Sequence, residues 1–154
     1  MTLAAGDAAP AFDMPTDTGQ VSLRDLKGKT VVLYFYPKDD TPGCTMEAQG
    51  FTAAADDFAR AGVVVIGVSK DSAERHGKFR AKYGLTPLLG SAKDNDTVER
   101  YGAWVEKSLY GRQYMGIDRS TYLIDGAGVI RRVWRKVKVK GHVDEVLKAT
   151  RQLA

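Results

Sequence analysis

TVVLYFY at residues 30–36 is an almost continuous run of β-branched, aromatic and other apolar residues. Such a run is typical of a strand that is buried on both faces. Pro37 ends it, since proline has no N–H to give to a strand ladder. A second run, VVVIGV at residues 63–68, follows a segment with a helical pattern that is long enough to cross over between parallel strands. The two runs together predict a βαβ unit.

The crossover segment has recognisable helix ends. Thr41 suits the N-cap, Pro42 suits the first helical position, and Gly62 lies where a C-terminal cap belongs. The residues at positions 44, 48, 51, 55 and 58 are Cys, Ala, Phe, Ala and Phe, which form one apolar stripe at helical spacing. Cys44 therefore begins the core-facing side of this helix, in its first turn.

Helical and extended patterns alternate along the rest of the chain. A helix is expected from Asp71, its cap, to Gly84, with Phe79 and Tyr83 on its apolar face. A short helix at 95–101, a hairpin of strands 120–124 and 129–134, and a final helix at 141–153 follow. This order predicts a thioredoxin-like α/β fold, a central mixed β-sheet flanked by helices, with residues 12–26 as an N-terminal extension. No repeat, linker or low-complexity tract is present, so residues 1–154 are expected to form a single domain.

The composition, 44% hydrophobic and 27% charged, is ordinary for an enzyme in aqueous solution. The longest apolar run is strand-sized, shorter than the roughly 18 residues that a membrane span needs. Residues 1–7 have neither the basic nor the apolar part of a signal peptide, so export is not expected. Cys44 is the single cysteine, and no internal disulfide can form. These features predict a cytoplasmic protein in a reducing compartment.

The net charge of +4 is unevenly spread. Residues 131–140 hold six of the 23 basic residues, one Trp and no acid, which permits a nucleic-acid-binding surface. The alternation of Lys and Val there also describes a strand with a solvated basic face, on which lysines prevent edge-to-edge pairing. We favour the strand, because no nucleic-acid-binding motif accompanies the run.

Cys44 is the residue whose setting suggests chemistry. A thiol attacks as its thiolate, and the first turn of a helix offers free N–H groups and a positive dipole end to an anion. Gly43 lets a small substrate approach the backbone, and the Thr41 hydroxyl lies three residues away on the same turn. A free cysteine is also commonly a small buried hydrophobe. Spacing and capping alone leave both interpretations open.

Residues 37–47, PKDDTPGCTME, fill every fixed position of Pro-x-x-x-Thr-x-x-Cys-x-x-Glu. This pattern resembles the active site of the peroxiredoxins. The longer run from Tyr34 to Thr45 resembles the bacterioferritin comigratory protein, or peroxiredoxin Q, subfamily, as do GVSKD at 67–71, YGRQYMGIDRST at 110–121 and WRKVKV at 134–139. The resemblance spans nearly the whole chain.

The resemblance implies a role for each of five residues. Cys44 is the peroxidatic nucleophile, which becomes a sulfenic acid, and Thr41 hydrogen-bonds with the peroxide and the thiolate. Pro37 shields the sulfur and shapes the pocket. Arg119 favours the thiolate and holds the peroxide, and Glu47 pairs with that arginine. The activity implied is reduction of hydrogen peroxide and organic hydroperoxides, without a cofactor.

The chain departs from many members of the resembled family at the resolving cysteine. The two positions where that second thiol is expected hold Gln49 and Arg80. The sulfenic acid then requires an external thiol, such as thioredoxin, or glutathione with glutaredoxin. The subfamily also implies a monomer. His76 and His142 have no other ligands at metal-binding spacing, so surface or capping roles are expected for both.

Three other functions are weighed against the peroxidase. A thioredoxin-fold binding module that has lost its chemistry is opposed by the presence of Thr41, Cys44 and Arg119. A nucleic-acid-binding or chaperone-like protein would use the basic run. A disulfide reductase is disfavoured, because Glu47 stands where a Cys-x-x-Cys motif needs its second thiol.

Overall fold

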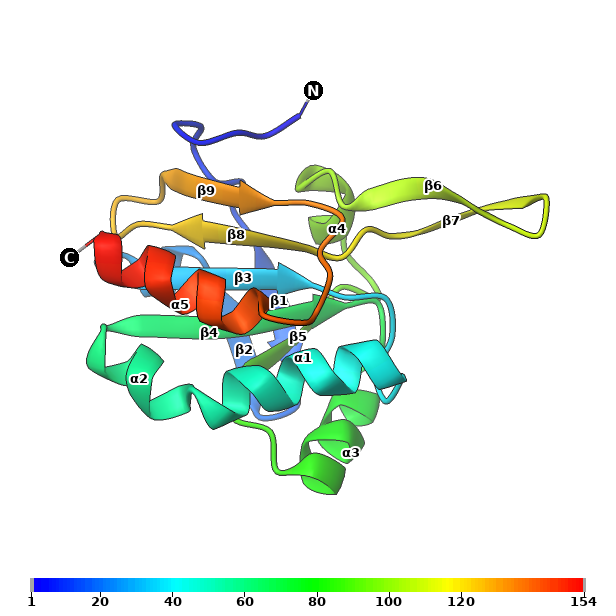
Figure 1. Ribbon diagram of the computed structural model, residues 1–154, viewed down its shortest axis with the longest axis horizontal. Coiled ribbons are helices and arrows are strands. Elements are labelled where there is room, and N and C mark those ends of the chain that lie inside the picture. Colours follow the sequence, from blue (N-terminus) through cyan, green and yellow to red (C-terminus); the bar gives the residue numbers. More distant parts are fainter. Residues whose placement is uncertain (1, 154) are drawn as a thin grey trace.

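A seven-stranded mixed β-sheet organises the chain, of which the computed structural model describes residues 2–153 (Figure 1). β3, β4 and β5 are parallel, and the strands on either side of them run antiparallel to their neighbours. Across the sheet the strands lie in the order β2 (Gly19–Ser22), β1 (Asp13–Thr16), β5 (Leu88–Ser91), β4 (Val63–Ser69), β3 (Thr30–Phe35), β8 (Ser120–Ile124) and β9 (Ile130–Trp134).

The predicted βαβ unit is present at the centre of the sheet. β3 pairs in parallel with β4, with Val31 opposite Val64 and Phe35 opposite Val68. The crossover consists of two helices, α1 (Pro42–Ala53) and α2 (Ala55–Arg60), which are separated at Ala54. Thr41 and Pro42 occupy the N-cap and first helical positions as expected.

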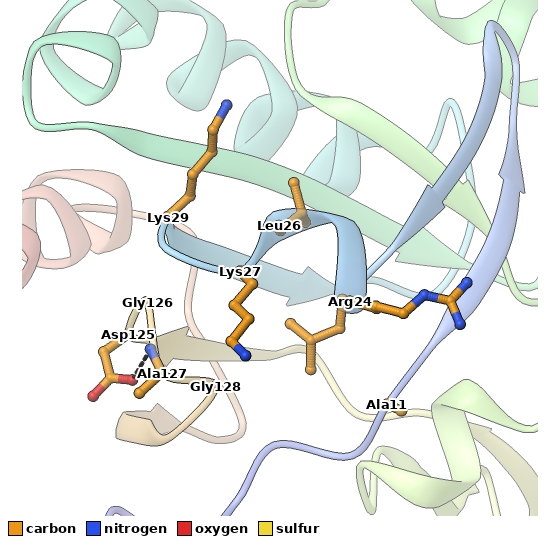
Figure 2. Close-up of a pocket in the computed structure, with 10 residues that line it drawn as sticks. Ala11, Arg24, Leu26, Lys27, Lys29, Asp125, Gly126, Ala127 and Gly128 are labelled. Atoms are coloured by element: carbon orange, nitrogen blue, oxygen red, sulfur yellow. Dashed lines mark hydrogen bonds between the residues drawn. The ribbon is translucent and has the colours of Figure 1, made fainter.

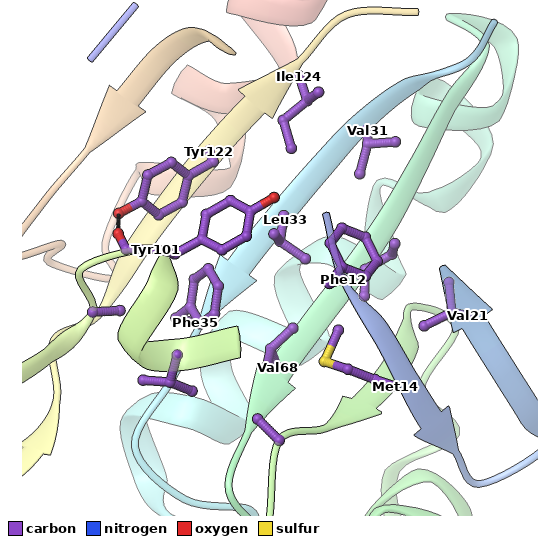
Figure 3. Close-up of a cluster of buried hydrophobic side chains, with 14 of the residues drawn as sticks. Phe12, Met14, Val21, Val31, Leu33, Phe35, Val68, Tyr101, Tyr122 and Ile124 are labelled. Carbon is purple, nitrogen blue, oxygen red and sulfur yellow. Dashed lines mark hydrogen bonds between the residues drawn. The ribbon is translucent and has the colours of Figure 1, made fainter. Parts of the chain in front are cut away.

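The helices divide unequally between the two faces of the sheet. α1, α2, α3 (Ala73–Tyr83) and α5 (His142–Gln152) supply residues to the hydrophobic core on one face. The other core packs β-strand residues against the N-terminal segment and α4 (Thr97–Arg100), as Figure 3 shows for Phe12, Phe35, Tyr101 and Tyr122. Alternate residues of β3 enter the two cores, which explains why that strand is apolar throughout.

Several sequence predictions need correction. The cap of α3 is Ser72, whose hydroxyl accepts from the Arg75 N–H, and not Asp71. The strand over the basic run stops at Trp134, and Lys136 has a φ of 48°, which no strand tolerates. Neither β5 nor the hairpin of β6 (Trp104–Leu109) and β7 (Arg112–Ile117), which projects from the body in Figure 1, was expected.

The N-terminal extension is part of the sheet. Its strands β1 and β2 form a hairpin, and Thr16 of β1 pairs with Gly90 of β5. The 3-10 helix η1 (Arg24–Leu26) leads from this hairpin into β3. Within residues 2–153 we find no helix with the length and apolar character to cross a membrane.

Candidate active site

Cys44 lies in the first turn of α1, beyond the carboxyl end of β3. The loop at residues 37–41 joins the two elements, so the central strand fixes where the helix begins. The Cys44 side chain is 1% exposed and contributes to the core below α1. Burial alone would suit a structural cysteine, and the groups beside the sulfur therefore decide its character.

Arg119 and Glu47 complete a line of three side chains with Cys44. Arg119 follows β7 and precedes β8, and its Nη2 lies 3.3 Å from Cys44 Sγ. Its Nη1 donates to Glu47 Oε1 at 2.7 Å. Glu47 lies one turn after Cys44 on α1, so one helix carries both partners of the guanidinium. The geometry places a fixed positive charge against the sulfur.

Burial affects the pKa values of both Glu47 and Arg119. Glu47 is fully buried, and desolvation raises its pKa to about 7 although Arg119 opposes the shift. Its second oxygen, Oε2, has no hydrogen-bond partner among the described residues. Desolvation lowers the pKa of Arg119, but its electrostatic interactions and hydrogen bonds with Glu47 and Cys44 outweigh this effect, and the net shift of the pKa is upward. The guanidinium therefore stays charged.

The Thr41 hydroxyl does not cap the helix. It donates to the Lys38 carbonyl oxygen at 2.8 Å, and its lone pairs remain available as acceptors. The first backbone N–H bonded to the preceding turn is that of Thr45, which donates to Thr41 O at 2.8 Å. Within residues 2–153, the N–H groups of Gly43 and Cys44 have no backbone acceptor, as expected at a helix N-terminus.

Gly43 accommodates the arginine. A Cβ atom built at Gly43 would lie 3.1 Å from Arg119 Nη2, which is closer than nine in ten Cβ contacts in proteins. The absent side chain leaves room for the guanidinium. That Gly43 also admits a small substrate to the backbone stays a prediction. Pro37, the fifth residue that the sequence singled out, is exposed at the start of the loop.

Both histidines are buried, and their predicted surface roles are wrong. His76 is fully buried on α3 and contacts Asp39 of the loop. His142, at the start of α5, lies 2.8 Å from the Thr121 hydroxyl through Nε2. His76, Phe79 and Tyr83 follow one another at intervals of three and four residues, so helical spacing could have placed His76 on the inner face of α3.

A separate cavity lies at the end of the sheet opposite to Cys44. It measures about 240 Å³ and lies between η1 and the turn at residues 125–128 (Figure 2). Lys29 and Arg24 extend in different directions around it, so its cations do not converge on one ligand. Asp125 Oδ1 accepts from the N–H groups of Ala127 and Val129 and serves the turn. Residues 2–153 contain no group of three His, Cys, Asp or Glu that could hold a metal ion.

The chain is similar to several known proteins along nearly its whole length. The AhpC/TSA family model matches residues 5–133. Peroxiredoxin Bcp of Bacillus subtilis is 47% identical over all of this chain and 99% of its own. The structure of Xylella fastidiosa PrxQ superimposes with a TM-score of 0.92 at 35% identity, covering 99% of this chain and 98% of its own.

A further solved structure, the Xanthomonas campestris bacterioferritin comigratory protein, was studied for its alkyl peroxide reduction activity. It has a TM-score of 0.88 at 40% identity and covers 95% of this chain and 98% of its own. These likenesses confirm the thioredoxin-like fold, and the family match extends over the loop at residues 37–41, α1 and Arg119. The chain belongs to the AhpC/TSA family, as a thiol-dependent peroxidase of the peroxiredoxin Bcp, or peroxiredoxin Q, group.

Proposed function

We propose that Cys44 reduces hydrogen peroxide and organic hydroperoxides and becomes a sulfenic acid. The observation that carries this proposal is the 3.3 Å contact between Arg119 Nη2 and Cys44 Sγ, with Glu47 holding the other guanidinium nitrogen. The alkyl peroxide reduction described for the Xanthomonas campestris relative supports the substrate class. If Cys44 were only a buried core residue, no arginine would be needed beside its sulfur.

The Cys44 thiolate attacks one oxygen of the peroxide, an S–O bond forms and the O–O bond breaks. The sulfur is oxidised to S–OH, and the remaining oxygen leaves as hydroxide or alkoxide, which takes a proton to become water or an alcohol. Negative charge thus moves from sulfur to the leaving oxygen. Donors at the leaving oxygen lower the barrier, whereas donors at the sulfur increase the fraction of thiol that is ionised.

Ionisation of the thiol gives only part of the rate. A free thiol with a pKa of about 8.5 is a few per cent ionised at pH 7, so complete ionisation accelerates its reaction by roughly thirtyfold, or about 2 kcal/mol. A larger acceleration requires groups that bind the peroxide. We assign this work to Arg119 as donor, to Thr41 as acceptor and to the free N–H groups of Gly43 and Cys44. Pro37 shields the sulfur from bulk water in this scheme.

Reduction of the sulfenic acid falls to an external thiol. One thiol displaces water from S–OH to form a mixed disulfide, and a second thiol releases Cys44 as the free thiol. Gln49 and Arg80 occupy the positions where a resolving cysteine would stand, and Arg80 is engaged by Asp17. Thioredoxin, or glutathione with glutaredoxin, would supply the electrons. We further propose that residues 1–154 act as a single domain, as a monomer and in the cytoplasm.

The nucleophile is tested with Cys44→Ser. A serine hydroxyl at this position is far less ionised than a thiol, so peroxide consumption is expected to vanish while the circular dichroism spectrum and unfolding midpoint are retained. Mass spectrometry of the wild-type protein after one equivalent of peroxide should show one oxygen on Cys44, trapped by dimedone. Peroxide turnover by Cys44→Ser equal to that of the wild type would refute the assignment.

The electron donor is identified in parallel peroxidase assays. Thioredoxin with its reductase, glutaredoxin with glutathione, and no donor are compared at equal enzyme concentration. A single turnover is expected without a donor, and continued turnover with at least one of the two thiol systems. A binding module without chemistry would consume no peroxide in any of the three assays.

A further inference from the structure

Asp39 is the buried residue of the otherwise exposed or half-buried loop at residues 37–41. Its carboxylate accepts from Tyr36 Oη at 2.6 Å and lies 2.6 Å from His76 Nδ1. Its backbone N–H donates to Asp71 Oδ2 at 2.8 Å. Asp39 therefore fastens the loop before the helix of Cys44 to the protein interior, and the exposed Asp40 adds contacts with α3, accepting from Lys82 Nζ at 2.8 Å and Tyr83 Oη at 2.6 Å.

His76 uses both ring nitrogens. Nε2 lies 3.0 Å from the Gly90 carbonyl oxygen, which can only accept, so Nε2 donates. Nδ1 faces a carboxylate oxygen at 2.6 Å, and a proton must lie between the two atoms. The side chains of His76 and Asp39 are 0% and 2% exposed. His76 thus ties α3 and β5 to the catalytic loop through a contact shielded from solvent.

One peptide group links Asp39 to the Thr41 hydroxyl, near the sulfur of Cys44. The N–H of the peptide between Lys38 and Asp39 is held by Asp71, and its carbonyl oxygen accepts the Thr41 hydroxyl at 2.8 Å. That carbonyl takes the only proton of the hydroxyl. The Thr41 lone pairs are consequently aimed by a peptide whose orientation depends on Asp39.

We propose that His76, acting through Asp39, is a positioning residue that aims the Thr41 hydroxyl at the peroxide; the inference rests on the proposed role of Cys44. A purely structural role is the competing explanation. A buried pair of ionisable groups often contributes little net stability, since the cost of desolvating the two groups offsets much of their attraction, and apolar residues in their place often fold as well. What the contact between His76 and Asp39 provides here is a fixed orientation of the loop at residues 37–41.

The inference is tested by a double-mutant cycle on the rate of Cys44 oxidation by hydrogen peroxide. His76→Phe, which removes both hydrogen bonds, is expected to slow oxidation about tenfold in the wild-type background. In a Thr41→Val background the same change is expected to cost less than about twofold, because no hydroxyl remains to be aimed. Alkylation of Cys44 by iodoacetamide, which needs no aimed peroxide, is expected to change by less than about twofold.

The exposed Lys78, two residues after His76 on α3, supplies the matched control. Lys78→Ala should leave both rates unchanged. Equal slowing by His76→Phe with and without Thr41, or equal slowing of oxidation and alkylation, would overturn the inference. If His76→Phe does not fold, Tyr36→Phe, which removes one hydrogen bond to Asp39, replaces it in the double-mutant cycle. Independent effects of Tyr36→Phe and Thr41→Val on the oxidation rate would also overturn the inference. An inactive wild-type protein would instead refute the proposed function.

Discussion

The Thr41 hydroxyl has one proton, and the Lys38 carbonyl oxygen receives it at 2.8 Å. Toward a peroxide, Thr41 can therefore act as an acceptor, while Arg119 and the helix N–H groups act as donors. This division of roles suits the substrate, because a peroxide O–H needs an acceptor and its breaking O–O bond needs donors. In the proposed reaction, the role of Thr41 toward the peroxide thus depends on the direction of a single hydroxyl proton.

Thr41→Val and Thr41→Ser separate this hydroxyl from the shape of its side chain. Valine keeps the volume and loses the acceptor, so oxidation of Cys44 by peroxide is expected to slow by about ten- to hundredfold, or roughly 1.4 to 2.7 kcal/mol. Serine keeps the hydroxyl and should stay within about fivefold of the wild type. Stopped-flow measurement of Cys44 oxidation gives both rates.

Alkylation of Cys44 by iodoacetamide serves as the control for Thr41→Val, because it reports the reactivity of the sulfur without a peroxide. Thr41→Val should leave the alkylation rate nearly unchanged. If both rates fell together, Thr41 would only tune the thiolate. A wild-type oxidation rate in Thr41→Val would remove Thr41 from the mechanism altogether.

Arg80 holds α3 in place and occupies one of the two positions where a resolving cysteine would stand. Its guanidinium donates to Asp17 at 2.5 and 3.2 Å and to the carbonyl oxygens of Leu85 and Pro87 at 2.6 and 2.8 Å. Asp17 belongs to the turn between β1 and β2, so Arg80 joins α3 to the edge of the sheet. The side chain of Asp17 is 6% exposed.

Arg80→Ala is expected to lower the free energy of unfolding by about 2 kcal/mol, because it leaves a buried carboxylate and two carbonyls without their donor. Lys78→Ala, on the same helix, removes an ion pair whose partners are 79% and 82% exposed, and should change stability by less than about 0.5 kcal/mol. Urea denaturation of both variants makes the comparison. Equal losses would show that Arg80 contributes no more than a surface charge.

Elements with strong apolar patterns could be predicted from the sequence, and those without them could not. β3, β4 and the hairpin of β8 and β9 were predicted because burial on one or both faces leaves a readable pattern. β6 and β7 are largely exposed and show no such alternation. Their turn, Tyr110-Gly111, has positive φ at both residues, and tyrosine is an uncommon choice there.

The basic run illustrates how a tertiary contact overrides a local pattern. The alternation of Lys and Val predicted a strand through residue 140, but the chain leaves the sheet after Trp134. The Val137 N–H instead donates to the Arg119 carbonyl oxygen at 2.9 Å. These residues thus help to hold the backbone of Arg119 beside Cys44, a purpose that no local propensity reveals.

The proximity of Arg119 to Cys44 likewise came from the family resemblance and not from spacing. The two residues are 75 positions apart, and only the pairing of β8 with β3 brings them together. Glu47 could be placed one turn from Cys44 by helical spacing alone. Its contact with Arg119 again required the fold. The buried histidines were missed because polar residues were assigned to the surface by type.

For the molecule as a whole, Glu47 and His142 make stability depend on pH in opposite senses. Burial raises the pKa of Glu47 to about 7, so between about pH 4.5 and 7 the folded state retains a proton that the unfolded chain has lost. Stability falls as pH rises through that range. Burial lowers the pKa of His142 to about 4, so between about pH 6.5 and 4 the unfolded chain gains a proton that the folded state does not. Stability falls as pH drops there.

The two effects overlap between about pH 4.5 and 6.5, where each is on the order of 3 kcal/mol in total and largely cancels the other in the wild-type protein. Glu47→Gln keeps an acceptor for Arg119 and removes one effect, so relative to the wild type its free energy of unfolding should rise with pH across this range. His142→Gln removes the other effect, and its relative stability should fall with pH. Urea denaturation at half-unit steps from pH 4 to 7.5 measures both differences, and the acidic groups common to all three proteins cancel in them. A flat difference profile, or two profiles that slope in the same direction, would mean that at least one buried group does not titrate as its surroundings require, since desolvation must raise the pKa of a carboxyl group and lower that of an imidazole.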